Sequence, residues 1–161
     1  MPLATVHSRA RLGVDAPLVT IEVHLSAGLP AFNIVGLPEA TVREAKDRVR
    51  SALINSHFTF PVSRITVNLA PADLPKEGGR FDLPIAIGIL VASGQLQQRE
   101  TESYEFIGEL GLSGELRTVN AALPTALATA DASRQLVLPS GSASLAELLP
   151  PDTLQEATDL L

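Results

Sequence analysis

One stretch of the chain is apolar on nearly every side, and it limits the folds that the sequence can adopt. Residues 81–96 read FDLPIAIGILVASGQL, and their longest apolar run, Leu83 to Ser93, carries a proline and a glycine. This run is too short to span a bilayer, and a helix that is hydrophobic all round has to be buried. Pro84 falls in the first turn, where its missing N–H costs little. The sequence therefore predicts a central helix covered by other elements.

The segments before this helix show the two-residue period of β-strands. Residues 17–26 alternate apolar and polar side chains, as a half-buried strand does, and residues 5–14 resemble a partner strand. Residues 31–35 form a third candidate. A fourth begins at Pro61 and alternates through residues 65–69. These strands predict a sheet with one apolar face.

Helical spacing marks the elements that cover such a sheet. Residues 40–56 place apolar side chains on one stripe and charged side chains opposite, which is typical of a helix packed on a sheet. Residues 106–119 indicate a hairpin with its turn at Ser113-Gly114. The remaining candidates are a helix at 121–132, a strand at 135–138 and a helix from Ser142.

This order of elements predicts a single α+β domain with a mixed sheet packed against helices. The chain has 161 residues, of which 45% are apolar, and this is enough for one sizeable core. We expect the domain over residues 1–149. Residues 150–161 are expected to be a linker or the start of a further element.

Composition and charge exclude several classes of protein. The chain has no cysteine, which excludes a disulfide framework, a thiolate nucleophile and a Cys-ligated metal. The net charge of −6 argues against a generic basic nucleic-acid binder. Residues 1–80 hold nine Lys and Arg against seven Asp and Glu, a charge of +2, whereas residues 81–161 hold three against eleven, a charge of −8. A basic surface is therefore expected only on the N-terminal half, and the alternative is an ordinary mixed surface.

The usual motifs for nucleotide or metal chemistry are missing from the sequence. It contains no GxxxxGK[ST], no GxGxxG and no HExxH. The three histidines are not at metal-ligand spacing. His7 and His24 are candidates for neighbours across paired strands, but no carboxylate accompanies them. We therefore predict no metal site.

Prolines, glycines and charged residues are densest in residues 70–84, APADLPKEGGRFDLP, which connect a strand to the central helix. The pair of glycines permits left-handed or close backbone geometry, and a helix N-terminus is a natural anion site. With Lys76 and Arg80 beside it, one hypothesis is a phosphate contact. The other is a tight structural turn in which Asp82 caps the helix and Lys76 is solvated. The spacing alone favours the turn.

The same loop resembles the proteolytic domain of Lon, in which Pro-Lys-Asp-Gly-Pro-Ser-Ala-Gly opens a buried helix. Laying this motif on residues 75–78 puts the nucleophilic serine of Lon at Arg80 and the catalytic lysine of Lon near Leu123. Arginine cannot attack a carbonyl and leucine cannot accept a proton. No lysine follows Lys76 in the chain. The resemblance therefore implies a Lon-like fold with no catalytic residues.

Three longer stretches, at residues 6–53, 65–90 and 106–117, resemble the magnesium chelatase-like competence family called ComM or YifB. In that family an N-terminal Lon-like domain precedes an AAA+ motor, and the whole resembles hexameric DNA helicases that promote branch migration in natural transformation and recombination. The resemblance implies ATP and Mg for the motor, which this chain lacks, and no cofactor for the chain itself. It also implies DNA and further copies of the chain as partners, no membrane, and a cytoplasmic location.

Two sets of residues are candidates for a role in this function. The nucleic-acid or interface candidates are Arg43, Lys46, Arg50, Lys76 and Arg80. The residues of the structural motif are Gly36, Pro38, Asp73, Pro75, Gly78, Gly79, Asp82, Pro84, Gly108 and Glu109. Charged helix faces are often merely solvated. Three functions remain open: direct DNA contact, a pure oligomerisation scaffold, and a residual serine hydrolase with a displaced nucleophile.

Overall fold

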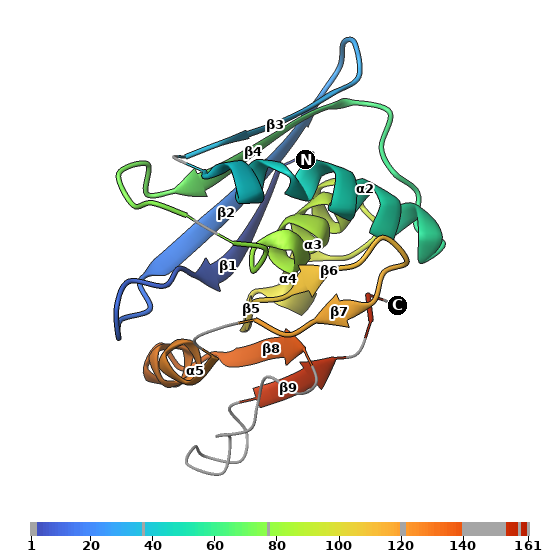
Figure 1. Cartoon of the computed structure of the whole chain (residues 1–161). Coiled ribbons are helices and arrows are strands. Elements are labelled where there is room, and N and C mark those ends of the chain that lie inside the picture. The colour runs from blue at the N-terminus through green and yellow to red at the C-terminus, as the bar shows by residue number, and fades with distance from the viewer. Residues whose placement is uncertain are drawn as a thin grey trace.

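The computed structural model describes residues 3–36, 38–76, 78–119, 122–139, 154–157 and 159–160. Figure 1 shows a mixed sheet with helices packed against it. The strands are β1 (Leu3–Arg9), β2 (Leu18–Ser26), β3 (Ala31–Val35), β4 (Arg64–Ala70), β5 (Tyr104–Phe106), β6 (Glu109–Leu110), β7 (Leu116–Arg117), β8 (Gln135–Pro139) and β9 (Leu154–Ala157). The helices are α1 (Ala40–Arg43), α2 (Ala45–Asn55), α3 (Asp82–Ala92), α4 (Gln98–Thr101) and α5 (Ala122–Asp131).

Seven of the strands form one mixed sheet in the order β3-β4-β2-β1-β5-β8-β9. β2 pairs antiparallel with both β1 and β4, and β3 lies parallel to β4. β1, β5, β8 and β9 follow one another as parallel neighbours, and the register between β1 and β5 consists of the pair His7 and Glu105. β6 and β7 form a separate hairpin. The predicted single α+β domain with a mixed sheet is confirmed.

α3 is the central helix that the sequence predicts. Every residue of α3 except Ile87 is buried. The helix packs on β1 and β2 on one side and contacts α2 and β6 on others, which explains why it has no polar face. A Cβ on Gly88 would lie 2.5 Å from Val23 Cγ2 of β2. The glycine therefore allows the helix to lie close against the sheet.

The buried apolar side chains form two separate clusters. The larger core lies between the sheet and the helices α2 and α3, and it contains the inward-facing side chains of the predicted alternating strand, Val19, Ile21 and Val23. The smaller cluster lies around α5 and β8 and consists of Ile107, Ala126, Leu136 and Leu138. β8 borders both clusters, because Leu136 and Leu138 belong to the smaller one and Val137 packs against the larger core.

Several boundaries differ from the sequence prediction. The helix predicted over residues 40–56 is divided at Glu44 into α1 and α2, and the hairpin predicted over 106–119 is shorter and is formed by β6 and β7, after β5 ends at Phe106. α4 was not predicted, because its four residues are too few to show a period. Residues 154–157, which were expected to belong to a linker or to the start of a further element, form β9, and this strand pairs with β8. The helix predicted from Ser142 lies outside the described residues.

No helix within the described ranges is long and apolar enough to cross a membrane.

Candidate functional site

The lysine of the loop after β4 is buried. Lys76 has no exposed surface, and its Nζ donates to the carbonyl oxygens of Gly36, at 2.6 Å, and of Pro71. Its own carbonyl oxygen accepts from the N–H of Glu39 at 2.9 Å. Burial lowers the pKa of the Lys76 ammonium, and the charge of Asp73 opposes this change. Lys76 thus fastens its loop to the segment after β3, which differs from both expectations, a solvated side chain and a phosphate contact.

The segment that receives this lysine is itself held in place. Gly36 has a φ of +105°, and a Cβ there would lie 2.2 Å from the carbonyl oxygen of Leu69 on β4. A side chain at this position would collide with backbone atoms, so a glycine is required. Pro38 forms an isolated parallel bridge with Lys76. Both motif residues therefore shape the chain around the loop.

The two glycines of the loop meet different needs. Gly78 has a φ of +79°, in the left-handed region, and its N–H donates to Thr41 Oγ1 of α1 at 3.1 Å. A Cβ on Gly79 would lie 2.3 Å from Glu109 Oε1. The first glycine permits a backbone conformation, and the second allows the Glu109 side chain to lie against the loop.

Arg80, which the resemblance to Lon places at the serine position, is buried with 6% of its surface exposed. Its Nη2 donates to Thr125 Oγ1 of α5 at 2.8 Å, whereas no group among the described residues bonds its buried Nε. No carboxylate of the described residues forms an ion pair with it. Burial, together with the neighbouring charge of Arg11, lowers the pKa of Arg80 to about 10. The guanidinium therefore remains protonated at neutral pH.

Asp82 does not cap the central helix, and that expectation is corrected. The N-cap residue is Phe81, and Asp82 lies in the first turn with no capping hydrogen bond. Its carboxylate instead accepts from Arg48 Nε and Nη2 at 2.6 and 3.0 Å and from the N–H of Leu110 at 3.0 Å. Burial raises the pKa of Asp82, and the bond from Arg48 opposes that rise. Asp82 therefore ties α3 to α2 and to β6.

A pocket of about 390 Å³ opens beside the glycine pair. Its lining residues come from several segments and are Arg11, Glu39, Thr41, Gly78, Gly79, Arg80, Glu109, Thr118 and Val119. The fold thus brings Arg80, the glycine pair and Glu109 from the predicted sets to one place. Lys76 is not part of this lining.

The other predicted cations lie on α1 and α2. Arg43 and Arg50 are exposed, and Lys46 is half-buried. The Arg50 guanidinium lies over the ring of Phe60, with 5.6 Å between its carbon and the ring centroid. None of the three lines the pocket. The candidate cations therefore divide into a helix-face group of Arg43, Lys46 and Arg50, and a loop group of Lys76 and Arg80.

The remaining motif residues have structural places. Asp73 and Pro75 are exposed, and Pro84 is buried in the first turn of α3. Gly108 joins the loop to the strand region, since its N–H donates to the Arg80 carbonyl at 2.9 Å and its carbonyl accepts from the Leu83 N–H at 3.0 Å. Leu123 belongs to α5, and its side chain lies outside the described part of the chain.

The histidines do not form the pair that their strands suggest. In the β1–β2 register His7 lies opposite Thr20, whereas His24 lies opposite Leu3. Among the described residues there is also no group of three His, Cys, Asp or Glu side chains that is suited to hold a metal ion.

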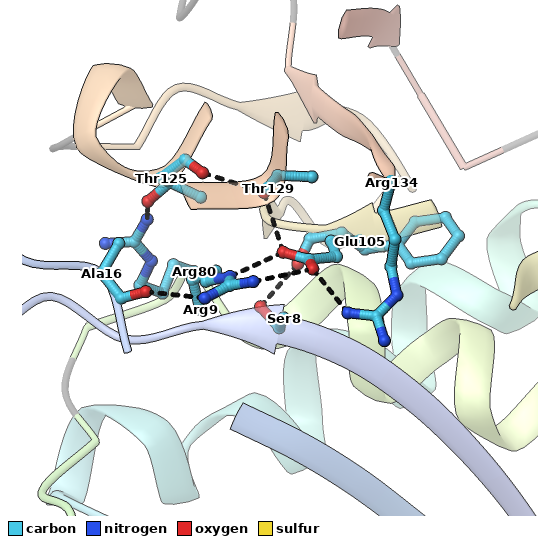
Figure 2. A network of polar contacts seen from close by, with 9 residues as sticks. Ser8, Arg9, Ala16, Arg80, Glu105, Thr125, Thr129 and Arg134 are labelled. Carbon is cyan, nitrogen blue, oxygen red and sulfur yellow. Dashed lines mark hydrogen bonds and ion pairs between the residues drawn. The ribbon is translucent and has the colours of Figure 1, made fainter. Parts of the chain in front are cut away.

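A buried ionic cluster that the sequence did not reveal joins β1, β5 and α5 (Figure 2). Glu105 is fully buried and accepts from Arg9 Nε and Nη2 at 2.8 and 3.0 Å, from Arg134 Nη1 at 2.8 Å and from Thr129 Oγ1 at 2.8 Å. Burial by itself would raise the pKa of Glu105, but these contacts outweigh it and hold that pKa below its ordinary value. The partner arginines lie 96 and 29 residues away, so no local pattern marks the cluster.

Comparison with known proteins shows the family to which the chain belongs. Residues 21–142 match the family described as subunit ChlI of Mg-chelatase. The chain belongs to this magnesium chelatase-like family. Over its whole length it is 58% identical to the competence protein ComM of Haemophilus influenzae, of which it covers 32%. It is also 56% identical to YifB of Escherichia coli, over 86% of this chain and 27% of that protein.

More distant members of this magnesium chelatase-like family include a protein of Mycobacterium tuberculosis that is 39% identical over 80% of this chain and 25% of its own length. The chain thus spans about a third of the length of ComM. The assignment to the ComM and YifB family, made from the sequence alone, is confirmed.

Proposed function

We propose that the chain is a non-catalytic module of a hexameric, ATP-dependent DNA helicase that acts in natural transformation and recombination, where it contributes DNA contact. The non-catalytic part is supported by the chemistry of the Lon-like loop. Arg80 stands in the nucleophile position, and of the two lysines in the chain, Lys76 is engaged with carbonyl oxygens. A serine needs a base placed to take its proton, and the loop offers none.

The link to DNA is supported by the relatives. The whole chain is similar to a protein named for competence, and the match covers about a third of that protein. We place ATP and Mg in the AAA+ motor that the family resemblance implies, outside the matched third. The chain then serves the motor as an attached domain, without a reaction of its own.

The surface for DNA contact is proposed to be the helix-face group. Arg43 and Arg50 are exposed and Lys46 is half-buried, so these side chains are accessible to phosphate groups. Lys76 and Arg80 are both buried. Contacts between exposed cations and phosphates are independent of sequence and weaken with salt.

This surface is tested by replacing Arg43, Lys46 and Arg50 together with glutamine and measuring binding to fluorescent single-stranded and branched DNA at several salt concentrations. We expect weaker binding to every sequence. On single strands the slope of log K against log salt should become shallower by about 2, since each phosphate contact contributes about 0.7.

The matched control removes the same charge from elsewhere, by replacing the exposed residues Arg64, Arg99 and Arg117 with glutamine. This variant should keep nearly all of the binding. Equal losses in the two triple variants would show that only net charge matters, and absence of DNA binding by the unaltered chain would rule out direct contact.

A second candidate function, ring assembly without DNA contact, is favoured by apolar residues near the β3 edge of the sheet. Leu29 and Val62 are each 86% exposed, and they flank the paired ends of β3 and β4. If this region joins copies of the chain, replacing both residues with serine should reduce self-association in sedimentation experiments. DNA binding per chain would then stay unchanged.

A further inference from the structure

The starting point is the charge of Arg80, which has no counter-ion in the described part of the chain. The side chain is buried, its Nη2 bonds the neutral hydroxyl of Thr125, and its Nε has no described partner. By contrast, Arg9, Arg48 and Arg134 all reach buried carboxylates. A buried cation without an anion is unfavourable, and an anion that binds beside it relieves this cost.

Arg80 is also part of a pocket wall, so a ligand has access to it. The lining adds a second cation, the exposed Arg11, from the connection between β1 and β2. The arrangement of the two charges is unfavourable in the free protein, since the Arg11 charge helps to lower the pKa of Arg80. An oxyanion between two guanidinium groups turns this repulsion into two attractions.

The same lining also carries acceptors. Glu109 is half-buried and lies against Gly79, where only a glycine leaves room for it, and Glu39 is exposed. The pocket therefore offers cations and carboxylates together, at a volume of about 390 Å³. Pockets of this size hold small organic molecules, and a carboxylate in such a site accepts from ligand hydroxyl or amino groups.

We propose that this pocket binds a phosphate-bearing ligand of nucleotide size, with the phosphate at Arg80 and Arg11 and a hydroxyl or amino group at Glu109. A phosphate group has enough terminal oxygens to accept from two guanidinium groups at once, and arginine forks match its geometry. The phosphate comes either from a free nucleotide or from a nucleic-acid strand. This inference goes beyond the proposed function and does not depend on the helix-face group.

The test is a ³¹P NMR titration of the chain with inorganic phosphate and with deoxyadenosine monophosphate, at constant ionic strength. We expect the nucleotide to bind more tightly than phosphate. Arg80→Met, which keeps the volume and removes the charge, should weaken binding about tenfold or more, as the loss of a charged hydrogen bond does. Arg64→Met is the control and should bind as the unaltered chain does.

Competition experiments distinguish the two possible sources of the phosphate. Displacement of the nucleotide by an oligothymidylate points to a nucleic-acid strand, and its failure to compete points to a free nucleotide. Equal competition by acetate would overturn the proposal, because it would show a general carboxylate site. Unchanged nucleotide binding in Arg80→Met, or no binding by the unaltered chain, would overturn it as well.

Two more variants test the nucleotide site without relying on the folding of Arg80→Met and separate it from the helix-face group. Arg11→Gln changes an exposed side chain, so the protein should remain folded and bind the nucleotide more weakly. The triple glutamine variant of the helix-face group should bind the nucleotide normally. If that variant loses DNA binding and keeps nucleotide binding, the two sites are distinct. If Arg11→Gln binds the nucleotide as tightly as the unaltered chain, the pocket is not the site.

Discussion

Replacing Glu105 with alanine is expected to lower the free energy of unfolding by about 3 to 5 kcal/mol, the typical cost of removing one partner from a buried ion pair. The loss is large because Glu105 is the shared acceptor of Arg9, Arg134 and Thr129, and no other carboxylate of the described residues pairs with the two arginines. Urea unfolding followed by circular dichroism measures it. The control is Glu102→Ala, at an exposed site between α4 and β5, which should change stability by less than about 0.5 kcal/mol.

The same carboxylate predicts how stability depends on pH. The folded-state pKa of Glu105 lies below the ordinary value of 4.5, so the folded form binds this proton less readily than the unfolded form. The stability that Glu105 contributes is therefore complete above the ordinary pKa and is lost as pH falls through the folded pKa. Stability curves of the unaltered chain and of Glu105→Gln should converge in acid. If the two stability curves stay parallel at every acidic pH at which the protein is folded, Glu105 does not have a lowered pKa in the folded state.

Replacing Asp82 with alanine is expected to cost about 3 kcal/mol, since hydrogen bonds to a buried charge are among the stronger ones and their loss leaves donors unpaired. Asp82 accepts from two nitrogens of Arg48 and from the Leu110 N–H. Its loss should also loosen β6, which carries Glu109 into the pocket. Denaturant unfolding measures the loss of stability. Weaker nucleotide binding, measured under conditions in which the variant is fully folded, reports the loosening of β6.

The matched control for this variant is Asp131→Ala, at an exposed carboxylate in the last turn of α5. This change should leave stability within about 0.5 kcal/mol of the unaltered chain. An equal loss in both variants would mean that Asp82 contributes only net charge and not a specific link between α2, α3 and β6.

Much of the fold was predictable because its strands and helices have local periods. The alternation over residues 17–26 identified β2. The apolar run after the loop identified α3 as a helix covered by other elements. The short helix α4 was not predicted, since four residues carry no period, whereas β6 and β7 are the two strands of the hairpin predicted over residues 106–119. β9 escaped because it joins the sheet through pairing with β8, which the local sequence does not encode.

The candidate site was predictable in its loop but not in its charges. Glycines and prolines at residues 70–84 marked a constrained turn, and the resemblance to Lon marked Arg80. Whether a lysine is solvated or buried depends on distant carbonyl groups, here those of Gly36 and Pro71, so the place of Lys76 followed only from the fold. The role of Asp82 likewise depends on Arg48, which lies 34 residues away.

The junction between β1 and β5 has a consequence for how the protein opens. The register between these two strands is a single residue pair, and polar links join them, such as the bond from Ser8 Oγ to the Phe106 carbonyl at 2.6 Å. These links are polar but not weak, because they include the buried ion pair between Arg9 and Glu105, whereas β2, β4 and α3 share the larger apolar core. Once Glu105 is protonated in acid, we expect the region of α5 and β8 to separate as a cooperative unit while β2, β4 and α3 stay assembled. Protons on its backbone amides would then exchange with solvent through this partial opening, ahead of global unfolding.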